Sequence, residues 1–214
     1  PRGFILPAEY CNTYFNTPLN YREGYLEKVV SELVLPGLDW MQANIKLYSV
    51  RSTSYISAPG MMDTILNAGI SPDNLTYWSN ELGEGLALDC LRRFLHMFST
   101  SSLGVDPSFY HHYLEAIKTK YGVPVESDLS EDALQELVTQ FTEVLSEQEQ
   151  SIINDPAQQV KCCVRAVFES YNSEKARYYR KSNNISDHWG TAVVFQEMVY
   201  GNRNNDSCTG VFFT

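Results

Sequence analysis

The spacing of hydrophobic residues changes character twice along this chain. Residues 4–6 form a short apolar run that predicts a strand, and residues 22–33 place apolar side chains on one face of a helix. Pro36-Gly37 predicts the end of that helix. Residues 46–51 predict a second strand, which leads into a polar loop rich in serine and threonine. The first part of the chain is therefore expected to contribute strands to a sheet.

The middle of the chain has helical periodicity. Residues 84–98 repeat apolar side chains at intervals of three and four. Three further helices are predicted by capping residues, because a short polar side chain can accept a hydrogen bond from a free N–H of the first turn. These caps are Asp106 before Pro107, Ser130, and Asp155 before Pro156. We expect an almost purely helical unit over residues 75–155.

The strand pattern returns near the C-terminus. Residues 191–200 are rich in β-branched and aromatic side chains, Gly201-Asn202 predicts a turn, and residues 209–214 predict a return strand. The strands near 46–51 and 191–199 should lie in one sheet. The expected fold class is α+β, with a helical insert between two segments that carry strands.

Composition and charge narrow the functions that fit. The chain has 26 acidic and 16 basic residues, for a net charge of −10, which argues against nucleic acid or an anionic membrane as partner. No apolar run approaches the ~20 residues that span a bilayer. Five scattered cysteines make a disulfide framework unlikely and predict a reducing, cytoplasmic location. A local cationic pocket for a small phosphate ligand remains possible.

Three features could bind such a ligand, and each has a plainer alternative. Arg51 follows a strand and could grip phosphate oxygens, or it could be a surface arginine in an ion pair. Met62, after the Pro59-Gly60 turn, could pack on a purine or could fill the core. The stretch 201–210 could cradle phosphates with backbone N–H groups or be an ordinary turn. Four histidines show no metal-binding spacing, and no metal ligand is predicted: His96, His111, His112 and His188.

Together these segments resemble the nucleotide-binding domain of pyruvate, phosphate dikinase. The first signature is Ser49-Val-Arg51-Ser followed by Pro59-Gly-Met-Met-Asp-Thr-Ile-Leu-Asn67. The second is Gly190-Thr-Ala-Val, then Gln196-Glu-Met-Val-Tyr-Gly-Asn202, then Thr209-Gly210-Val. The similarity extends over essentially the whole chain.

The resemblance implies an ATP-grasp type fold that binds Mg-ATP. Its first subdomain would comprise residues 1–74 and 156–204, with the helical insert at 75–155 and the start of a further subdomain at 205–214. Family members convert ATP, pyruvate and phosphate to AMP, phosphoenolpyruvate and diphosphate through a phosphohistidine on another domain. The histidine-carrying and pyruvate-binding domains would be the partners, and the metal ligands would lie outside this chain.

The resemblance also assigns roles to individual residues. Arg51 matches the arginine that grips phosphate and would be catalytic, because phosphoryl transfer depends on positioning and positive charge. Met62 matches a residue that lines the nucleotide pocket. Gln196, Met198 and Val199 match the segment beside the adenine. Thr209 and Gly210 match the phosphate loop. Arg51, Met62 and Thr209-Gly210 are expected to face one cavity.

Several positions depart from the family pattern. Thr53 and Cys208 replace usual glycines, Tyr55 replaces a basic residue, and Ala58 replaces a methionine. The family's phosphate-binding lysine lies upstream of Gly3. We interpret the chain as a piece of a larger phosphotransferase that is inactive alone. The alternative is a naturally short, non-catalytic relative that acts as a nucleotide-binding or protein-interaction module.

Overall fold

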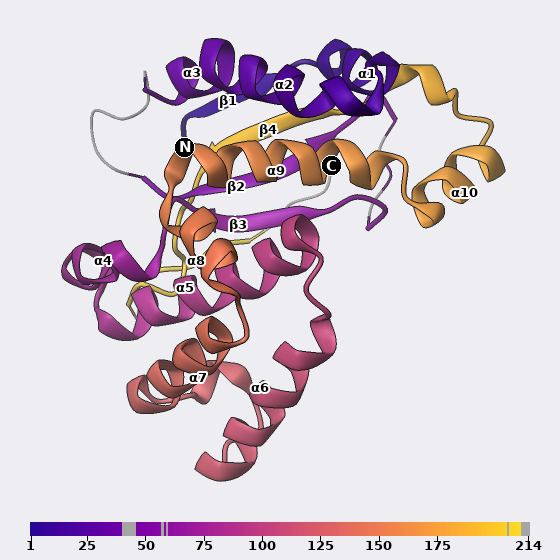
Figure 1. Ribbon diagram of the computed structural model, residues 1–214. Coiled ribbons are helices and arrows are strands. Elements are labelled where there is room, and N and C mark those ends of the chain that lie inside the picture. Colours follow the sequence, from indigo (N-terminus) through magenta and orange to yellow (C-terminus); the bar gives the residue numbers. More distant parts are fainter. Residues whose placement is uncertain (40–45, 57, 59, 205, 211–214) are drawn as a thin grey trace.

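Four antiparallel strands form the sheet of this protein (Figure 1). The computed structural model describes residues 1–39, 46–56, 58, 60–204 and 206–210. The strand order is β1-β4-β2-β3, so the strands nearest the two ends of the chain are neighbours. The strands are β1 (Gly3–Leu6), β2 (Tyr48–Thr53), β3 (Thr64–Ala68) and β4 (Ala192–Glu197). The pairing of β2 with β4 confirms that the two predicted strand regions share one sheet, and the fold is of the α+β class.

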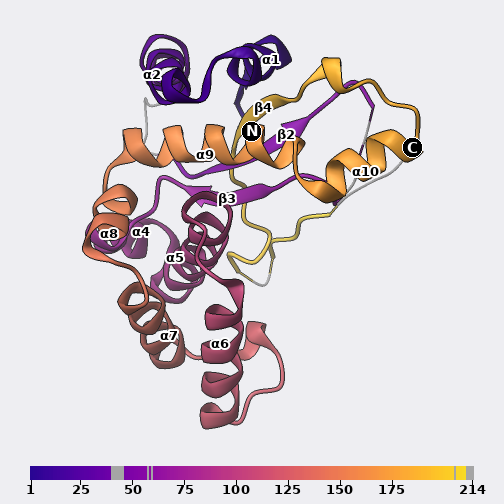
Figure 2. The same cartoon turned by 45° about the vertical axis from the view of Figure 1, so that its right-hand side comes forward.

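The two faces of the sheet differ in exposure. Side chains alternate between faces along a strand, so Tyr48 and Val50 are buried on one face while Arg51 and Thr53 are exposed on the other. Figures 1 and 2 show α9 lying across one face, with α1 and α2 beside it. The polar face of β2 is therefore the one that remains accessible to a ligand.

The helices occupy most of the described chain. Asp106, Ser130 and Asp155 cap their helices with side-chain hydrogen bonds, which confirms the three predicted starts. The α-helices are α1 (Ala8–Asn16), α2 (Leu19–Val29), α3 (Leu35–Asp39), α4 (Leu75–Leu82), α5 (Glu84–Phe98), α6 (Pro107–Tyr121), α7 (Glu131–Glu143), α8 (Glu147–Asn154), α9 (Pro156–Tyr171) and α10 (Glu174–Ser182). Shorter turns are η1 (Val30–Val34) and η3 (Ser99–Leu103), which are π-helical, and η2 (Pro72–Asn74), η4 (Glu126–Asp128) and η5 (Asp187–Trp189), which are 3-10.

The prediction that Pro36-Gly37 ends a helix is wrong. The chain stays helical through this pair as far as Asp39. The π-helical turn η1 precedes it, and Leu35 N–H donates to the Val30 carbonyl. A π turn moves the backbone out of the i to i−4 pattern, so a proline just after it neither removes a regular bond nor clashes with the preceding turn.

The expected return strand is not present where it can be checked. Thr209 and Gly210 lie in irregular backbone. The remaining expected positions, 211–214, lie outside the described residues.

One hydrophobic cluster connects the sheet with the helices that follow it. Between Leu75 and Asp155 every regular element is a helix, and Figures 1 and 2 show α6 and α7 extending away from the sheet. Buried residues there, such as Phe94 and Leu137, join the same cluster as Phe195 of β4. The division into subdomains stays a prediction. None of the helices in the described ranges is long and apolar enough to cross a membrane.

Candidate functional site

Arg51 lies on the exposed face of the sheet and carries a charge available for a ligand. It pairs with Val194 across β4 and with Thr64 across β3. Its Nη2 donates to Gln196 Oε1 at 3.5 Å. In the described part of the chain no carboxylate lies within ion-pair distance of Arg51. The alternative of a structural ion pair therefore finds no support here, and the guanidinium can still bind an external anion.

Gln196 connects Arg51 to the start of β2. Ser49 pairs with Gln196 in the sheet, and its Oγ donates to the Gln196 carbonyl at 3.4 Å. Side chains two residues apart on a strand share a face, so Ser49, Arg51 and Gln196 form one polar patch. Hydroxyl, amide and guanidinium groups together can donate hydrogen bonds to phosphate oxygens.

A cavity of about 380 Å³ opens where β4 ends. It has apolar walls from Leu66 and Leu86 and a charged side from α5, where Arg93 Nε donates to Asp89 Oδ2 at 2.8 Å. Three of the predicted site residues line it: Met198, Val199 and Thr209. A cavity that combines apolar side chains with charged and amide groups can hold a flat heterocycle that carries a charged tail.

Asp89 and Arg93 were not predicted as site residues. They lie four residues apart on α5, a spacing that an ordinary surface ion pair shares, so no motif in the sequence distinguishes them. Only the packing of α5 against β3 brings them to the cavity.

Two buried groups of this cavity have raised pKa values. Burial raises the pKa of the Cys90 thiol to about 12. Burial, together with the neighbouring Cys90, also raises the pKa of the Tyr200 hydroxyl. Both groups are therefore neutral at physiological pH, which suits an apolar wall.

The segment after β4 turns back tightly on itself. A Cβ on Gly201 would lie 2.2 Å from Thr209 N, so only glycine allows this approach. Asn204 Oδ1 holds the turn by accepting hydrogen bonds from Asp206 N at 3.0 Å and from Ser207 Oγ at 2.8 Å. Arg203 Nη2 ties the turn to α4 through the Glu81 carbonyl, at 3.3 Å. Thr209 is thereby placed at the cavity with its side chain exposed.

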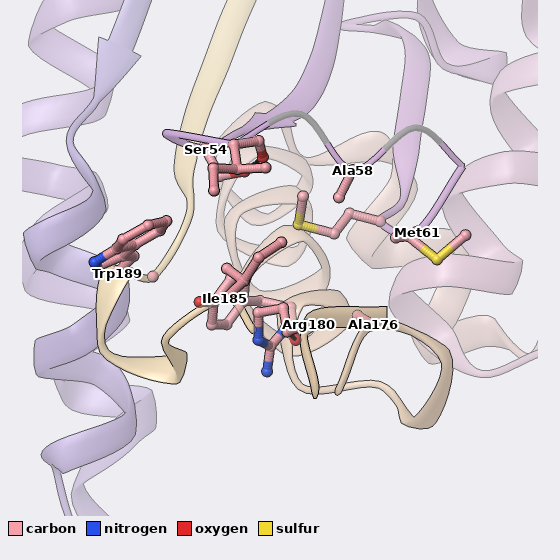
Figure 3. Close-up of a pocket in the computed structure, with 11 residues that line it drawn as sticks. Ser54, Ala58, Met61, Ala176, Arg180, Ile185 and Trp189 are labelled. Atoms are coloured by element: carbon pink, nitrogen blue, oxygen red, sulfur yellow. Dashed lines mark hydrogen bonds between the residues drawn. The ribbon is translucent and has the colours of Figure 1, made fainter. Parts of the chain in front are cut away.

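Met62 lines a different and much smaller cavity, of about 20 Å³. Figure 3 shows Ser54 and Ala58 on one side of this cavity and Ile185 and Arg180 on the other. The Arg180 guanidinium is already engaged, because its Nε donates to Asp187 Oδ1 at 2.6 Å and it stacks 3.8 Å from the centre of the Tyr171 ring. Arg180 is therefore a structural cation at this position.

The single cavity expected around Arg51, Met62 and Thr209-Gly210 is divided into two. Met198 N donates to the Leu47 carbonyl just before β2, whereas Ser54 in the Met62 cavity comes directly after β2. A six-residue strand is about 20 Å long, so residues beyond its two ends cannot line one compact cavity. Arg51 lies on the strand between them. Gly210 follows Thr209 in exposed backbone, and a Cβ there would meet no described atom within 4 Å.

Metal ligation finds little support among the described residues. No group of three or more His, Cys, Asp or Glu side chains there is arranged to hold a metal ion.

Comparison with known proteins identifies the family. The family model described as "Pyruvate phosphate dikinase, AMP/ATP-binding domain" matches residues 26–214. The pyruvate, phosphate dikinase of Rickettsia prowazekii is 36% identical over 222 residues, covering 100% of this chain and 25% of that protein. The chloroplastic pyruvate, phosphate dikinase 1 of Arabidopsis thaliana is 37% identical over 225 residues, covering 100% of this chain and 23% of that protein.

The chain thus spans about a quarter of the length of these relatives. The matched region includes both signatures that carry Arg51 and Gln196, and the cavity at the end of β4 lies wholly within it. The chain belongs to the family of pyruvate phosphate dikinase AMP/ATP-binding domains.

Proposed function

We propose that this chain binds ATP with its adenine in the cavity at the end of β4 and its phosphates toward Arg51. The observation that carries the proposal is the position of Arg51, an exposed guanidinium without a carboxylate partner in the described chain, on the strand that begins beside that cavity. Leu66, Leu86 and Met198 offer apolar surface to a purine ring. A net charge of −10 makes such a local cation necessary for polyphosphate binding.

Some residues of the site would bind the nucleotide, and Arg51 would also take part in the reaction. Met198 and Val199 would hold the base, and Gln196 would orient Arg51 through the side-chain hydrogen bond. Thr209 and the backbone N–H of Gly210 would contact phosphate oxygens. Arg51 would stabilise the negative charge that develops on the transferring phosphoryl group, where a fixed positive charge has its largest effect. Met62 would act from the neighbouring cavity, on the far side of Arg51.

The wider reaction is proposed from the family. In it, a longer protein uses this domain to transfer phosphoryl groups from Mg-ATP to a histidine on another domain and then to pyruvate. The net conversion is of ATP, phosphate and pyruvate to AMP, diphosphate and phosphoenolpyruvate. Mg²⁺ would supply charge neutralisation on the phosphates. The purified 214-residue chain is expected to form no AMP from these substrates.

A non-catalytic nucleotide-binding or interaction module is the second candidate. Tyr55 favours it, because a neutral residue replaces the basic residue usual in the family. Tyr55 is 89% exposed and packs edge-on against the Trp189 ring at 5.3 Å. An exposed aromatic pair at this position could contact another protein, and it supplies no charge to a phosphate.

Alkylation of Cys208 tests nucleotide binding directly. Cys208 is exposed and lines the proposed adenine cavity, whereas the other four cysteines are buried. Bound Mg-ATP should therefore slow the modification of Cys208, followed by mass spectrometry, and calorimetry should show binding at the same concentrations. Unchanged Cys208 reactivity under ATP concentrations that give calorimetric saturation would place the nucleotide elsewhere. The absence of any ATP binding would favour the interaction module.

A further inference from the structure

A third cavity, of about 680 Å³, lies apart from the proposed nucleotide site. Its walls come from α1, the start of α2, the C-terminal end of α9, α10 and η5. Figures 1 and 2 show α10 projecting beyond the end of α9, on the side of the molecule where α1 lies. We call this cavity the α1–α10 groove. The residues that matter for its charge are Arg22, Arg177, Asp187 and His188.

Arg22 is held firmly in the groove without a carboxylate. Its Nε and Nη2 donate to the carbonyls of Thr17 and Phe15, both at 3.0 Å. Its guanidinium carbon lies 5.1 Å from the centre of the Tyr14 ring and 5.4 Å from that of Phe15. These contacts fix the side chain but leave other N–H donors and the full positive charge available. Arg22 makes no ion pair with any described residue.

Arg177 supplies a second such cation from α10. Its Nε donates to the Asn172 carbonyl at 2.7 Å, and the side chain is exposed. It too lacks a carboxylate partner within the described ranges. Like Arg22, it is positioned through a backbone oxygen, which leaves the outer edge of the guanidinium free.

Among the described residues that line the groove, the one carboxylate is already paired with an arginine. Asp187 Oδ1 accepts from Arg180 Nε at 2.6 Å, and the Arg180 side chain is only 5% exposed. Asn12 Nδ2 donates to the His188 carbonyl at 2.9 Å and fixes η5 against α1. The groove is therefore a concavity with two positive charges that have no carboxylate partner among the described residues, in a protein whose net charge is −10.

We propose that the α1–α10 groove is a second anion site that binds a small ligand bearing phosphate groups, gripped by Arg22 and Arg177. Two guanidiniums can share the several oxygens of a phosphoryl group, and their planar donor pairs match its geometry. The volume lies in the range of small-molecule sites. The groove contains none of the residues assigned to ATP, so its occupancy is independent of the proposed nucleotide site.

Calorimetric titration with inorganic diphosphate, in a phosphate-free buffer of low ionic strength, tests the proposal. All variants are made in an Arg51→Gln background, which removes the main cation of the proposed nucleotide site. Arg177→Gln and Arg22→Gln should each weaken diphosphate binding about tenfold or more, as expected for loss of a charged hydrogen bond. Lys28→Gln is the matched control, because it removes the same charge from an exposed position on α2 outside the groove. It should change the affinity less than about twofold.

Two further measurements make the result decisive. Arg22→Lys keeps the charge of the side chain. Circular dichroism of each variant shows whether the fold survives. Arg177→Gln alters an exposed side chain, so the test remains valid if Arg22→Gln unfolds. Citrate, a polycarboxylate, should bind more weakly than diphosphate. Equal weakening by Lys28→Gln and Arg177→Gln, or unchanged binding in Arg177→Gln, would overturn the site. Binding of citrate as tight as that of diphosphate would overturn its preference for phosphate.

Discussion

Arg51 and Gln196 lie 145 residues apart in sequence and meet side by side in the sheet, where Arg51 Nη2 donates to Gln196 Oε1 at 3.5 Å. The contact joins the two family signatures in space. Because the bond is long and its acceptor is neutral, it orients the guanidinium without cancelling its charge. Arg51 can therefore be tested as a ligand group with little effect on folding.

Replacing Arg51 should weaken ATP binding selectively. Arg51→Gln removes a charged donor, and we expect the affinity for Mg-ATP to fall about tenfold or more, with Arg51→Lys intermediate because it loses the fork geometry. Calorimetry measures the affinity and thermal unfolding measures the stability, which should not change. Lys28→Gln serves as the charge control.

The same residue should matter more for chemistry than for binding. In a longer protein that performs the proposed reaction, Arg51→Ala should lower kcat by a larger factor than it raises the Kd for ATP, because charge stabilisation counts most in the transition state. A variant with normal kcat and weak binding would assign Arg51 to binding alone.

Gly201 should be required for the position of Thr209. In Gly201→Ala the new Cβ would meet Thr209 N at 2.2 Å, so the segment that returns to the cavity must move. We expect a loss of about 1–3 kcal/mol in stability from the steric conflict, together with weaker ATP binding. Gly24→Ala, on α2 and outside the cavity, is the matched control, since its Cβ meets no described atom within 4 Å. Equal behaviour of the two variants would contradict the close approach.

The stability of the protein should fall in acid partly through Glu23. Hydrogen bonding to Lys161 lowers the pKa of the Glu23 carboxyl below its ordinary value of 4.5, despite partial burial. A carboxyl with a lowered folded-state pKa contributes stability above its unfolded pKa and loses it as the pH falls through the folded pKa. Glu23→Gln should therefore lose less stability than wild type between about pH 6 and pH 3.5.

Urea unfolding at several pH values measures this effect. Glu27→Gln, on the same helix, is the control, because Glu27 makes no ion pair with a described residue. If Glu23→Gln and wild type show the same dependence on pH, the pair with Lys161 contributes nothing measurable.

Phe168 should be essential for packing between α9 and α1. Its side chain is fully buried, and its ring centre lies 5.6 Å from that of Tyr14. Phe168→Ala should cost about 3–5 kcal/mol, because it removes apolar contacts and leaves a cavity. Phe109→Ala, at a position that is 51% exposed, should cost far less. Thermal and urea unfolding compare the two variants.

Local chemistry in the sequence predicted much of the secondary structure. The caps at Asp106, Ser130 and Asp155 are each bonded to N–H groups two or three residues ahead, so neighbouring residues suffice to set those helix starts. The resemblance to the family likewise depended on contiguous motifs. In contrast, Pro36-Gly37 did not end the helix as predicted. The π turn before this pair lets the helix continue, and the two residues do not themselves determine that turn.

The sequence by itself determined the capped helices, the strand near Arg51 and the family. The tertiary structure decided which residues share a cavity. Sheet pairing brings Arg51 to Gln196, and the packing of α5 brings Arg93 to Thr209. The length of β2 separates the cavity of Met62 from the cavity of Met198 and Thr209. These arrangements result from contacts between segments that are far apart in the chain. Hydrophobic periodicity and motif spacing describe only residues that are near in sequence, so neither one predicts such contacts.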